Sequence, residues 1–253
     1  MDILVTLKWI PDPDLPDALL TFEDGRPAAR VPHTVGLFDK IALEVALALR
    51  ELEPGTRVRC VSIGPQAASE ALRVALTYLV DDARRLDLEC PFDTMTAARA
   101  LAAHLRKSGM PDLILVGEQS GDWDQGTFGP ALAALLDVPF VPRLLALGPD
   151  GERAGRIDHV ADERTEETLI VPLPLVASVT MIPGLKLRQP KLKDMIAAKK
   201  REVLVEASGE EPCLALGALV RAPKSEKSCL FLEGTLEEQV AKTVDILKEW
   251  RSA

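Results

Sequence analysis

Histidine, cysteine and aromatic residues are scarce in this 253-residue sequence, and their positions narrow the chemistry that the chain can perform. The three histidines lie far apart, and the four cysteines form no CxxC pair. This spacing argues against zinc sites and thioredoxin-like dithiols. The sequence also lacks a GxSxG elbow, a P-loop and a GxGxxG fingerprint. We therefore expect no catalytic residue and no metal site, and a binding or carrier role rather than a complete enzyme.

Positive net charge and long apolar runs are missing as well. The net charge of -9 argues against nucleic acid as the main partner, because phosphate contact requires an excess of lysine and arginine. No apolar stretch is long enough to span a bilayer, and the N-terminus enters a strand pattern without an export signal. We expect a reduced, cytoplasmic protein without direct membrane insertion.

The first 138 residues alternate between strand-like and helix-like patterns. Short apolar runs predict strands at 3–7, 58–62, 84–88 and 112–117, and apolar residues at helical spacing predict helices that begin near 36, 65, 95 and 131. Asp93 is the predicted N-cap of the helix that begins near 95, and Gly109 is its predicted end. A small hairpin is predicted at 19–31. This alternation predicts an α/β fold with a doubly wound, mainly parallel sheet and helices on both faces.

After Val138 the pattern changes. Strand-like stretches are predicted at 153–160, 167–180 and 202–205, with a helix at 192–199. Residues 207–227 show little pattern and are interpreted as an extended connector. The chain ends in a helix whose start carries a capping box, Thr235 with Glu238. The predicted organisation is an α/β domain, 1–206, and a C-terminal arm, 207–253. The apolar face of the last helix packs on its own domain or on a second chain.

The stretch from Asp112 to Leu136 is the strongest candidate for a site. An apolar strand ends at Gly117, an acidic loop rich in small residues follows, and an Ala/Leu helix comes next. In open parallel sheets, ligands bind outside the carboxyl ends of the strands, and free N–H groups at a helix start attract phosphate. An ordinary strand-to-helix connection is the alternative. Asp122 and Asp124 are typical of turn and cap formers rather than of paired catalytic acids.

Four separated segments of the chain together resemble one known family, the beta subunit of electron transfer flavoproteins. They are Ile3-Leu-Val-Thr-Leu-Lys-Trp-Ile-Pro-Asp12, Gly36-Leu-Phe-Asp-Lys-Ile-Ala-Leu-Glu44, the stretch 61–76 that begins Val-Ser-Ile-Gly-Pro, and the stretch from Asp112 to Pro130. Weaker matches follow at 173–176 and 195–200. The similarity covers nearly the whole chain, and the order and spacing of the segments are more specific than any one of them.

The resemblance implies a Rossmann-like domain of the adenine-nucleotide alpha-hydrolase type, with an extended arm that embraces an alpha subunit and ends in a helix. In that family the alpha subunit holds most contacts to a redox FAD. The beta subunit holds AMP, or a second FAD in electron-bifurcating members. The heterodimer passes electrons from an acyl-CoA-type dehydrogenase to a quinone oxidoreductase or another acceptor. A stand-alone adenine-nucleotide-binding or sensor module is the alternative function.

The resemblance also assigns roles to residues of this chain. Backbone N–H groups from Gly121 to Thr127 are expected to cradle phosphate, and Asp122 to shape the loop or bind ribose. Leu192 is the expected apolar anchor for a docking partner. The cofactor-binding candidates are Thr6, Gly36, Leu37, Phe38, Asp39, Ile63, Gly117, Glu118, Gln119, Ser120, Gly121, Asp122, Trp123, Asp124, Gln125, Gly126, Thr127 and Phe128. Thr6, Phe38 and Ile63 are expected beside the adenine and ribose.

Two departures from the family pattern bear on the choice of nucleotide. Trp123 is bulky where bifurcating members tend to carry glycine, which favours AMP over a second FAD. Gly126 stands where ordinary members often carry asparagine, which favours the second FAD. AMP is the preferred expectation, and the second FAD stays open.

Overall fold

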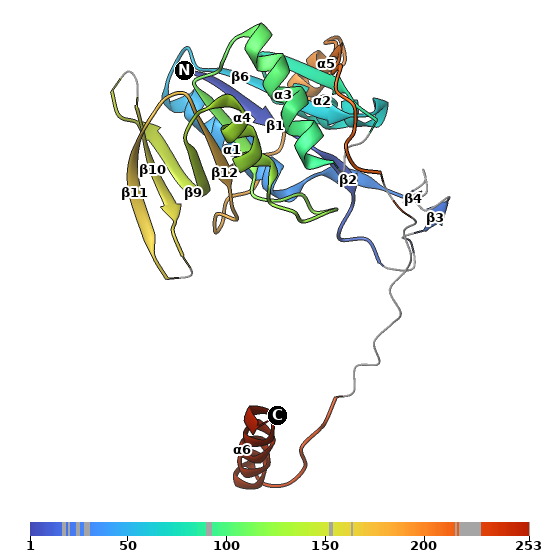
Figure 1. The fold of residues 1–253 in the computed structure, drawn as a ribbon, viewed down its shortest axis with the longest axis vertical. Coiled ribbons are helices and arrows are strands. Elements are labelled where there is room, and N and C mark those ends of the chain that lie inside the picture. Colours follow the sequence, from blue (N-terminus) through green and yellow to red (C-terminus); the bar gives the residue numbers. More distant parts are fainter. Residues whose placement is uncertain are drawn as a thin grey trace. The chain divides into compact units, whose positions relative to one another are not determined.

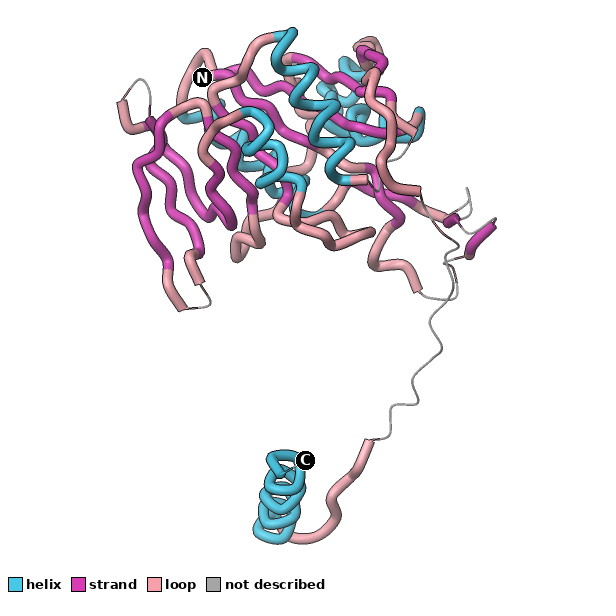
Figure 2. The backbone as a smooth tube through the Cα atoms, viewed as in Figure 1, coloured by secondary structure: helices cyan, strands magenta, loops and turns pink. Residues whose placement is uncertain are grey.

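A computed structural model of the chain divides it into two compact units, Met1–Ala218 and Leu219–Ala253, which are described separately. The residues that the structure describes are 1–16, 19, 21–23, 26–27, 31–89, 93–151, 154–162, 164–215, 217 and 229–252. Figure 1 labels the helices and most of the strands, and Figure 2 separates helices from strands by colour. Of the helices in these ranges, none has both the length and the apolar character that crossing a membrane requires.

A nine-stranded sheet forms the centre of the first unit (Figure 1). In spatial order its strands are β11 (Glu166–Pro172), β10 (Ala154–Val160), β9 (Phe140–Pro149), β12 (Leu175–Val179), β8 (Leu113–Gly117), β1 (Asp2–Thr6), β6 (Arg57–Gly64), β7 (Asp82–Asp87) and β13 (Leu204–Ala207). From β9 to β13 every neighbouring pair is parallel, whereas β10 runs antiparallel to both β9 and β11. This confirms the predicted mainly parallel α/β fold.

The order of the strands places a crevice beside β1. From β1 the chain continues outward on one side through β6 and β7, and then returns to add β8 on the other side of β1. Where the winding direction reverses, the connections leave in opposite directions and open a space beyond the carboxyl ends of the strands. The crevice therefore lies at the ends of β1, β6 and β8.

Both faces of the sheet are covered by helices, because the strands are apolar on both sides. In β1, Ile3 and Val5 join a core with α1 (Leu37–Leu52) and α2 (Ser69–Leu76), which follows the 3₁₀ turn η1 (Gln66–Ala68). The intervening Leu4 joins the other core, under α3 (Thr94–Ser108) and α4 (Phe128–Leu136). In Figure 2 these last two helices lie side by side over the near face. The alternation follows the two-residue period of a strand.

The predicted helix ends around α3 are confirmed. The Asp93 carboxylate accepts a hydrogen bond from the Thr96 N–H at 3.1 Å and so caps the start of the helix. Gly109 ends it with a φ of 101°, a conformation that glycine adopts without steric cost.

The expectation that residues 8–13 form only a loop is wrong in part. β2 (Trp9–Pro11) pairs antiparallel with β5 (His33–Val35), a partner about two dozen residues away that local pattern does not reveal. The hairpin predicted at 19–31 is supported by β3 (Phe22–Glu23) and β4 (Arg26–Pro27), which pair antiparallel. Its turn, residues 24–25, lies outside the described residues.

The region after residue 138 differs most from expectation. The strand-like stretch predicted at 167–180 contains two strands, β11 at the sheet edge and β12 in the parallel centre. The long β9, Phe140–Pro149, was not predicted, because its two prolines, Pro142 and Pro149, resemble a loop signal. Pairing with β12 on one side and β10 on the other outweighs that local preference.

The predicted helix at 192–199 is confirmed as α5 (Leu192–Ala198), and the predicted strand at 202–205 as β13, paired with β7. In the second unit, α6 (Leu236–Ser252) carries the predicted capping box. The Thr235 N–H donates to Glu238 Oε2 at 2.9 Å, and the Glu238 N–H donates to Thr235 Oγ1 at 3.4 Å. Of the predicted connector, residues 216 and 218–227 lie outside the described residues.

Candidate functional site

A pocket opens at the carboxyl ends of β1, β6 and β8, at the reversal point of the sheet. It contains about 680 Å³ of empty space, which includes space open to solvent. Its lining is Thr6, Leu7, Lys8, Asp39, Val61, Ile63, Thr94, Ala97, Gly117, Glu118, Gln119, Ser120, Gln125, Gly126, Thr127 and Phe128. The lining combines apolar strand ends with the polar loop that precedes α4.

The loop between β8 and α4 is held by side chains from three other parts of the fold. Lys8 Nζ donates to Asp122 at 2.9 Å, from the end of β1. Thr180 Oγ1, just after β12, donates to Glu118 Oε2 at 2.6 Å. Thr94 Oγ1, at the first residue of α3, donates to Gln125 Oε1. The loop is thus fastened at its start, middle and end.

The backbone of this loop twice enters the left-handed region. Asp124 has a φ of 54° and Gly126 a φ of 63°. Aspartate tolerates this conformation through short hydrogen bonds to nearby backbone, and glycine tolerates it without a Cβ clash. Gly126 also lines the pocket. A side chain at this position would strain the left-handed backbone and would also occupy space in the pocket.

Helix α4 begins at the pocket with its first amides free of side-chain caps. Its N-cap, Thr127, makes no side-chain capping bond in the described structure. The first four N–H groups of a helix have no partner within it, and they carry the positive end of the helix dipole. Pro130 lacks an N–H but stands in the first turn, where that donor has no role in the helix. The amides of Phe128 and Gly129 are therefore available to an anion.

Asp39, in the first turn of α1, is the most perturbed carboxyl of the pocket. The side chain is buried, and its Oδ2 accepts a hydrogen bond from the Lys8 N–H at 2.8 Å. Burial raises the pKa of Asp39 from its ordinary value of 3.8 to about 7, against the lowering influence of that bond and of the Lys8 charge. The nearby Asp122 carboxylate raises the Asp39 pKa further.

Two glycines make room for this carboxyl. A Cβ on Gly117 would stand 2.5 Å from Asp39 Oδ1, and a Cβ on Gly36 would stand 2.8 Å from Asp39 Oδ2. Both glycines were selected from the sequence as site residues. Their requirement here is space for Asp39, although Gly36 does not itself line the pocket.

The structure brings most of the sequence-predicted residues to one pocket, but not all. Those that line it are Thr6, Asp39, Ile63, Gly117, Glu118, Gln119, Ser120, Gln125, Gly126, Thr127 and Phe128. Those that do not are Gly36, Leu37, Phe38, Gly121, Asp122, Trp123 and Asp124. Sequence reasoning missed the lining residues Leu7, Lys8, Val61, Thr94 and Ala97. Two of these residues could have been found from the sequence. Lys8 directly follows the first strand, and Thr94 directly follows an N-cap.

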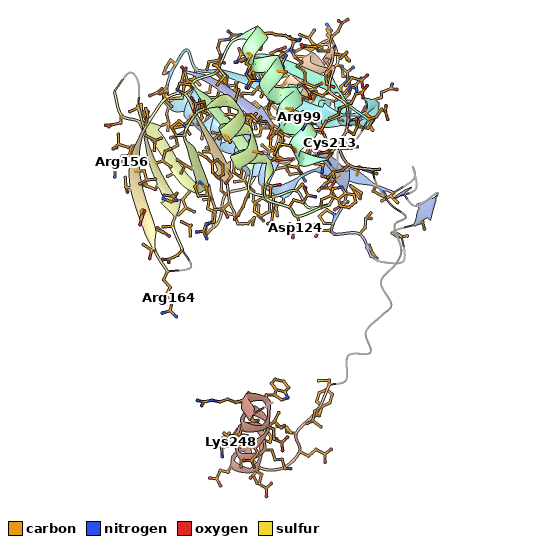
Figure 3. The ribbon with its side chains drawn as sticks, viewed as in Figure 1. Arg99, Asp124, Arg156, Arg164, Cys213 and Lys248 are labelled. Carbon is orange, nitrogen blue, oxygen red and sulfur yellow. The ribbon has the colours of Figure 1, made fainter. Side chains whose placement is uncertain are left out.

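The segment after β13 is attached to the start of α3, next to the pocket. The Asp93 carboxylate accepts the backbone N–H of Cys213 at 2.7 Å and of Leu214 at 3.0 Å. Burial would raise the pKa of Asp93, but hydrogen bonds from Thr96, Cys213 and Leu214 outweigh it and hold that pKa below its ordinary value. Arg99 reaches Glu210 at 3.1 Å and the Cys213 sulfur at 3.1 Å, and Figure 3 shows Arg99 beside Cys213.

Helices α5 and α6 each expose a group of large apolar side chains. On α5, Leu192, the predicted docking anchor, is 73% exposed, with Met195 and Ile196 exposed next to it. On α6 the exposed stripe consists of Leu236, Val240, Val244, Leu247 and Trp250. Contiguous exposed apolar surface is typical of protein interfaces.

Comparisons with known proteins agree on one family. The model of the electron transfer flavoprotein domain matches residues 28–207. The electron transfer flavoprotein subunit beta of Thermoanaerobacterium thermosaccharolyticum is 32% identical, over 98% of each chain. That of Bacillus subtilis is 30% identical, over 83% of this chain and 84% of its own. Subunit CarD of the caffeyl-CoA reductase-Etf complex of Acetobacterium woodii is 32% identical, over 69% of this chain and 66% of its own.

Proposed function

This chain belongs to the electron transfer flavoprotein family, in its beta-subunit branch, and from that premise we propose that it pairs with an alpha subunit to carry electrons on a shared FAD. The donor is an acyl-CoA-type dehydrogenase, and the acceptor is a quinone oxidoreductase or another electron carrier. The chain contributes binding and positioning, and a bound flavin supplies the redox chemistry. We place the heterodimer in the cytoplasm.

The pocket at the ends of β1, β6 and β8 is the observation that carries this proposal, and AMP is its proposed occupant. The apolar strand ends Leu7, Val61 and Ile63 offer a surface for a purine. The polar loop and the free amides at the start of α4 offer hydrogen-bond donors for a phosphate. The residues present therefore fit an adenine nucleotide.

The fit also assigns different tasks to the predicted residues. Thr6 and Ile63 flank the nucleoside, and Thr127 adds a hydroxyl to the backbone donors of Phe128 and Gly129. Asp122 is engaged by Lys8 at 2.9 Å, which supports a role in shaping the loop rather than in touching phosphate. The start of α1 contains Gly36, Leu37 and Phe38, which do not line the pocket and support the residues that do.

The alpha subunit is the proposed partner of the arm, residues 207–253. Its first residues are tied to α3 through Asp93, and its last helix, α6, presents the exposed stripe that ends at Trp250. Covering that stripe by a second chain removes apolar surface from water, which is the main driving force of association. Leu192 and its exposed neighbours on α5 are the proposed contact for the dehydrogenase.

The decisive experiment is purification of the chain with and without an alpha-subunit partner, followed by identification of released nucleotides by mass. One FAD and one AMP per heterodimer is the expected result. Two FAD per heterodimer would assign the second flavin to this pocket instead. A complex that never contains flavin would refute the carrier function.

A stand-alone nucleotide-binding or sensor module is distinguished by removal of residues 219–253, the second compact unit. A sensor keeps its nucleotide and its function after this truncation. For an electron carrier we expect the truncated chain to keep AMP and to lose the alpha subunit in co-purification. The exposed stripe of α6 favours the carrier, because a sensor has no use for that surface.

A further inference from the structure

Asp39 lies in the wall of the pocket, where an ionised carboxylate would repel an anionic ligand. It lines the same pocket as the donors at the start of α4, and only 8% of the residue is exposed. Gly36 and Gly117 enclose the carboxyl on two sides, since a Cβ on either would stand within 3 Å of one of its oxygens. A negative charge held here in a low-dielectric wall repels a phosphate more strongly than it would in water.

The charged groups that face Asp39 do not neutralise it. The Lys8 ammonium, from the end of β1, is bound to Asp122 at 2.8 Å rather than to Asp39. Glu118, from the loop before α4, lines the same pocket and accepts a hydrogen bond from the Thr180 hydroxyl. Asp122, from the same loop, does not line the pocket, but its negative charge raises the pKa of Asp39. The Asp39 carboxylate accepts a hydrogen bond from the backbone N–H of Lys8 at 2.8 Å, and a backbone hydrogen bond from Gly117 also lowers its pKa.

We propose that nucleotide binding at this pocket is linked to protonation of Asp39: one proton from solvent is taken up on its carboxyl as an anionic ligand enters. Lys8 sets how readily this happens, because its ammonium is the cation that stabilises the carboxylate form. The protonation state of Asp39 thus depends on the charge of the bound ligand. The inference rests on the proposed function, since it concerns the same nucleotide site.

The electrostatics of the free pocket support this linkage. With a pKa raised to about 7 by burial, Asp39 is divided between its two forms at neutral pH, so a modest perturbation changes its proton occupancy. A phosphate placed in the pocket raises that pKa further, because like charges disfavour the ionised form. Binding and proton uptake are then coupled by the same free energy.

Isothermal titration of AMP into the full chain, stripped of bound nucleotide, measures this coupling. The titration is repeated in buffers of different ionisation enthalpy, which gives the number of protons taken up per AMP. At about pH 7.5 we expect about half a proton, if AMP raises the Asp39 pKa by about one unit. AMP affinity then weakens about tenfold between about pH 6 and pH 9.

Two variants isolate the carboxyl. In Asp39→Asn the proton uptake at residue 39 is lost, and AMP binds about tenfold more tightly than to wild type above about pH 8. The AMP phosphate, which titrates near pH 6, contributes equally to both proteins and cancels in the difference. In Lys8→Met the pKa of Asp39 rises, so the maximum of proton uptake moves to higher pH. A merely structural role of either residue would not move this maximum.

Each outcome decides the proposal. AMP binding without proton uptake, or the same uptake in wild type and Asp39→Asn, would overturn the inference and leave the nucleotide site intact. Failure of AMP to bind wild type at any pH would refute the AMP assignment, and the inference with it. If Asp39→Asn does not fold, the proton count of wild type and the direction of the shift in Lys8→Met decide alone.

Discussion

Helices α1 and α6 have similar length and apolar periodicity, but their apolar faces have opposite environments. α1 has 16 residues and α6 has 17. In α1, Ile41 and Leu49 are 1% and 4% exposed, whereas in α6 Leu247 and Trp250 are 55% and 76% exposed. Periodicity therefore reports that a helix has an apolar face, and not what covers it.

The starts of the two helices differ in the same way. The first-turn acid of α1, Asp39, is buried in the pocket, whereas Glu237 in the first turn of α6 is exposed. α1 begins at Gly36 without a side-chain cap, and α6 begins with a complete capping box. A helix packed on a sheet gains most of its stability from tertiary contacts. α6, with its face exposed, depends more on signals in its own sequence.

The largest expected effect concerns the first-turn acids. Because burial raises the pKa of Asp39 from 3.8 to about 7, its contribution to stability is complete below about pH 4 and is lost as the pH rises through about 7. Relative to Asp39→Asn, the wild-type free energy of unfolding therefore falls by ~4 kcal/mol across this range. Urea denaturation at a series of pH values measures it. Glu237→Gln on α6 is the matched control and leaves the profile unchanged; equal profiles for all three proteins would contradict the burial argument.

The next effect concerns the apolar faces themselves. Ile41→Ala on α1 removes buried side-chain volume, and we expect the free energy of unfolding to fall by about 3 kcal/mol. The matched change on α6, Val244→Ala, is expected to alter the unfolding of the isolated chain by less than about 0.5 kcal/mol. Thermal and urea denaturation of both variants test the difference. A similar loss in the two would mean that the α6 face is covered in the free chain.

The exposed face of α6 is expected to contribute to partner binding rather than to the stability of the isolated chain. Trp250→Ala removes a large, exposed aromatic side chain from the proposed interface of α6. We expect it to weaken binding of the alpha subunit by about 2 kcal/mol, or about thirtyfold in affinity, as is typical of aromatic anchors. Titration calorimetry or surface plasmon resonance with the purified subunit measures the loss. Arg251→Ala, an exposed charge on the same helix, serves as control, and unchanged affinity in Trp250→Ala would place the partner elsewhere.

The smallest expected effect concerns the helix starts. Thr235→Ala removes the hydroxyl that accepts the Glu238 N–H and destabilises the first turn of α6 by about 1 kcal/mol. Amide hydrogen exchange in the full chain reports this as faster exchange near the start of α6. Exchange in α1 stays unchanged in this variant. If exchange in α6 were also unchanged, the capping box would have no energetic role.

Much of the fold followed from local pattern. The alternation that begins at Ile3, the cap at Asp93, the helix end at Gly109 and the capping box at Thr235 are each short-range signals, and the structure contains all of them. The failures involve long-range pairing: β9 contains prolines that resemble a loop, and β2 finds its partner only at β5. Strand pairing can outweigh local preference because ladder hydrogen bonds and burial are supplied by distant residues.

The candidate site divides along the same line. The loop that begins at Gly117 and the start of α4 could be predicted, because an apolar strand, small residues and a helix follow one another in the sequence. The position of Lys8 directly after the first strand was a usable signal for a pocket residue, but its contact with Asp122 could not be predicted, because it joins residues 114 positions apart. The buried environment of Asp39 could not be predicted either, because it depends on the end of β1 and on Gly117.

Periods of two and 3.6 residues, capping residues and turn residues are properties of neighbouring positions, so the amino-acid order alone was sufficient to predict most strands, the helices and the α/β class. Which strand lies beside β1, which loops meet at its end, and whether an apolar helix face is covered depend on surfaces brought together across the whole chain. For this reason, apolar stripes with similar spacing are buried on α1 and exposed on α6. Burial also changed the chemistry of one ordinary aspartate, because desolvation acts only once the fold has closed around it.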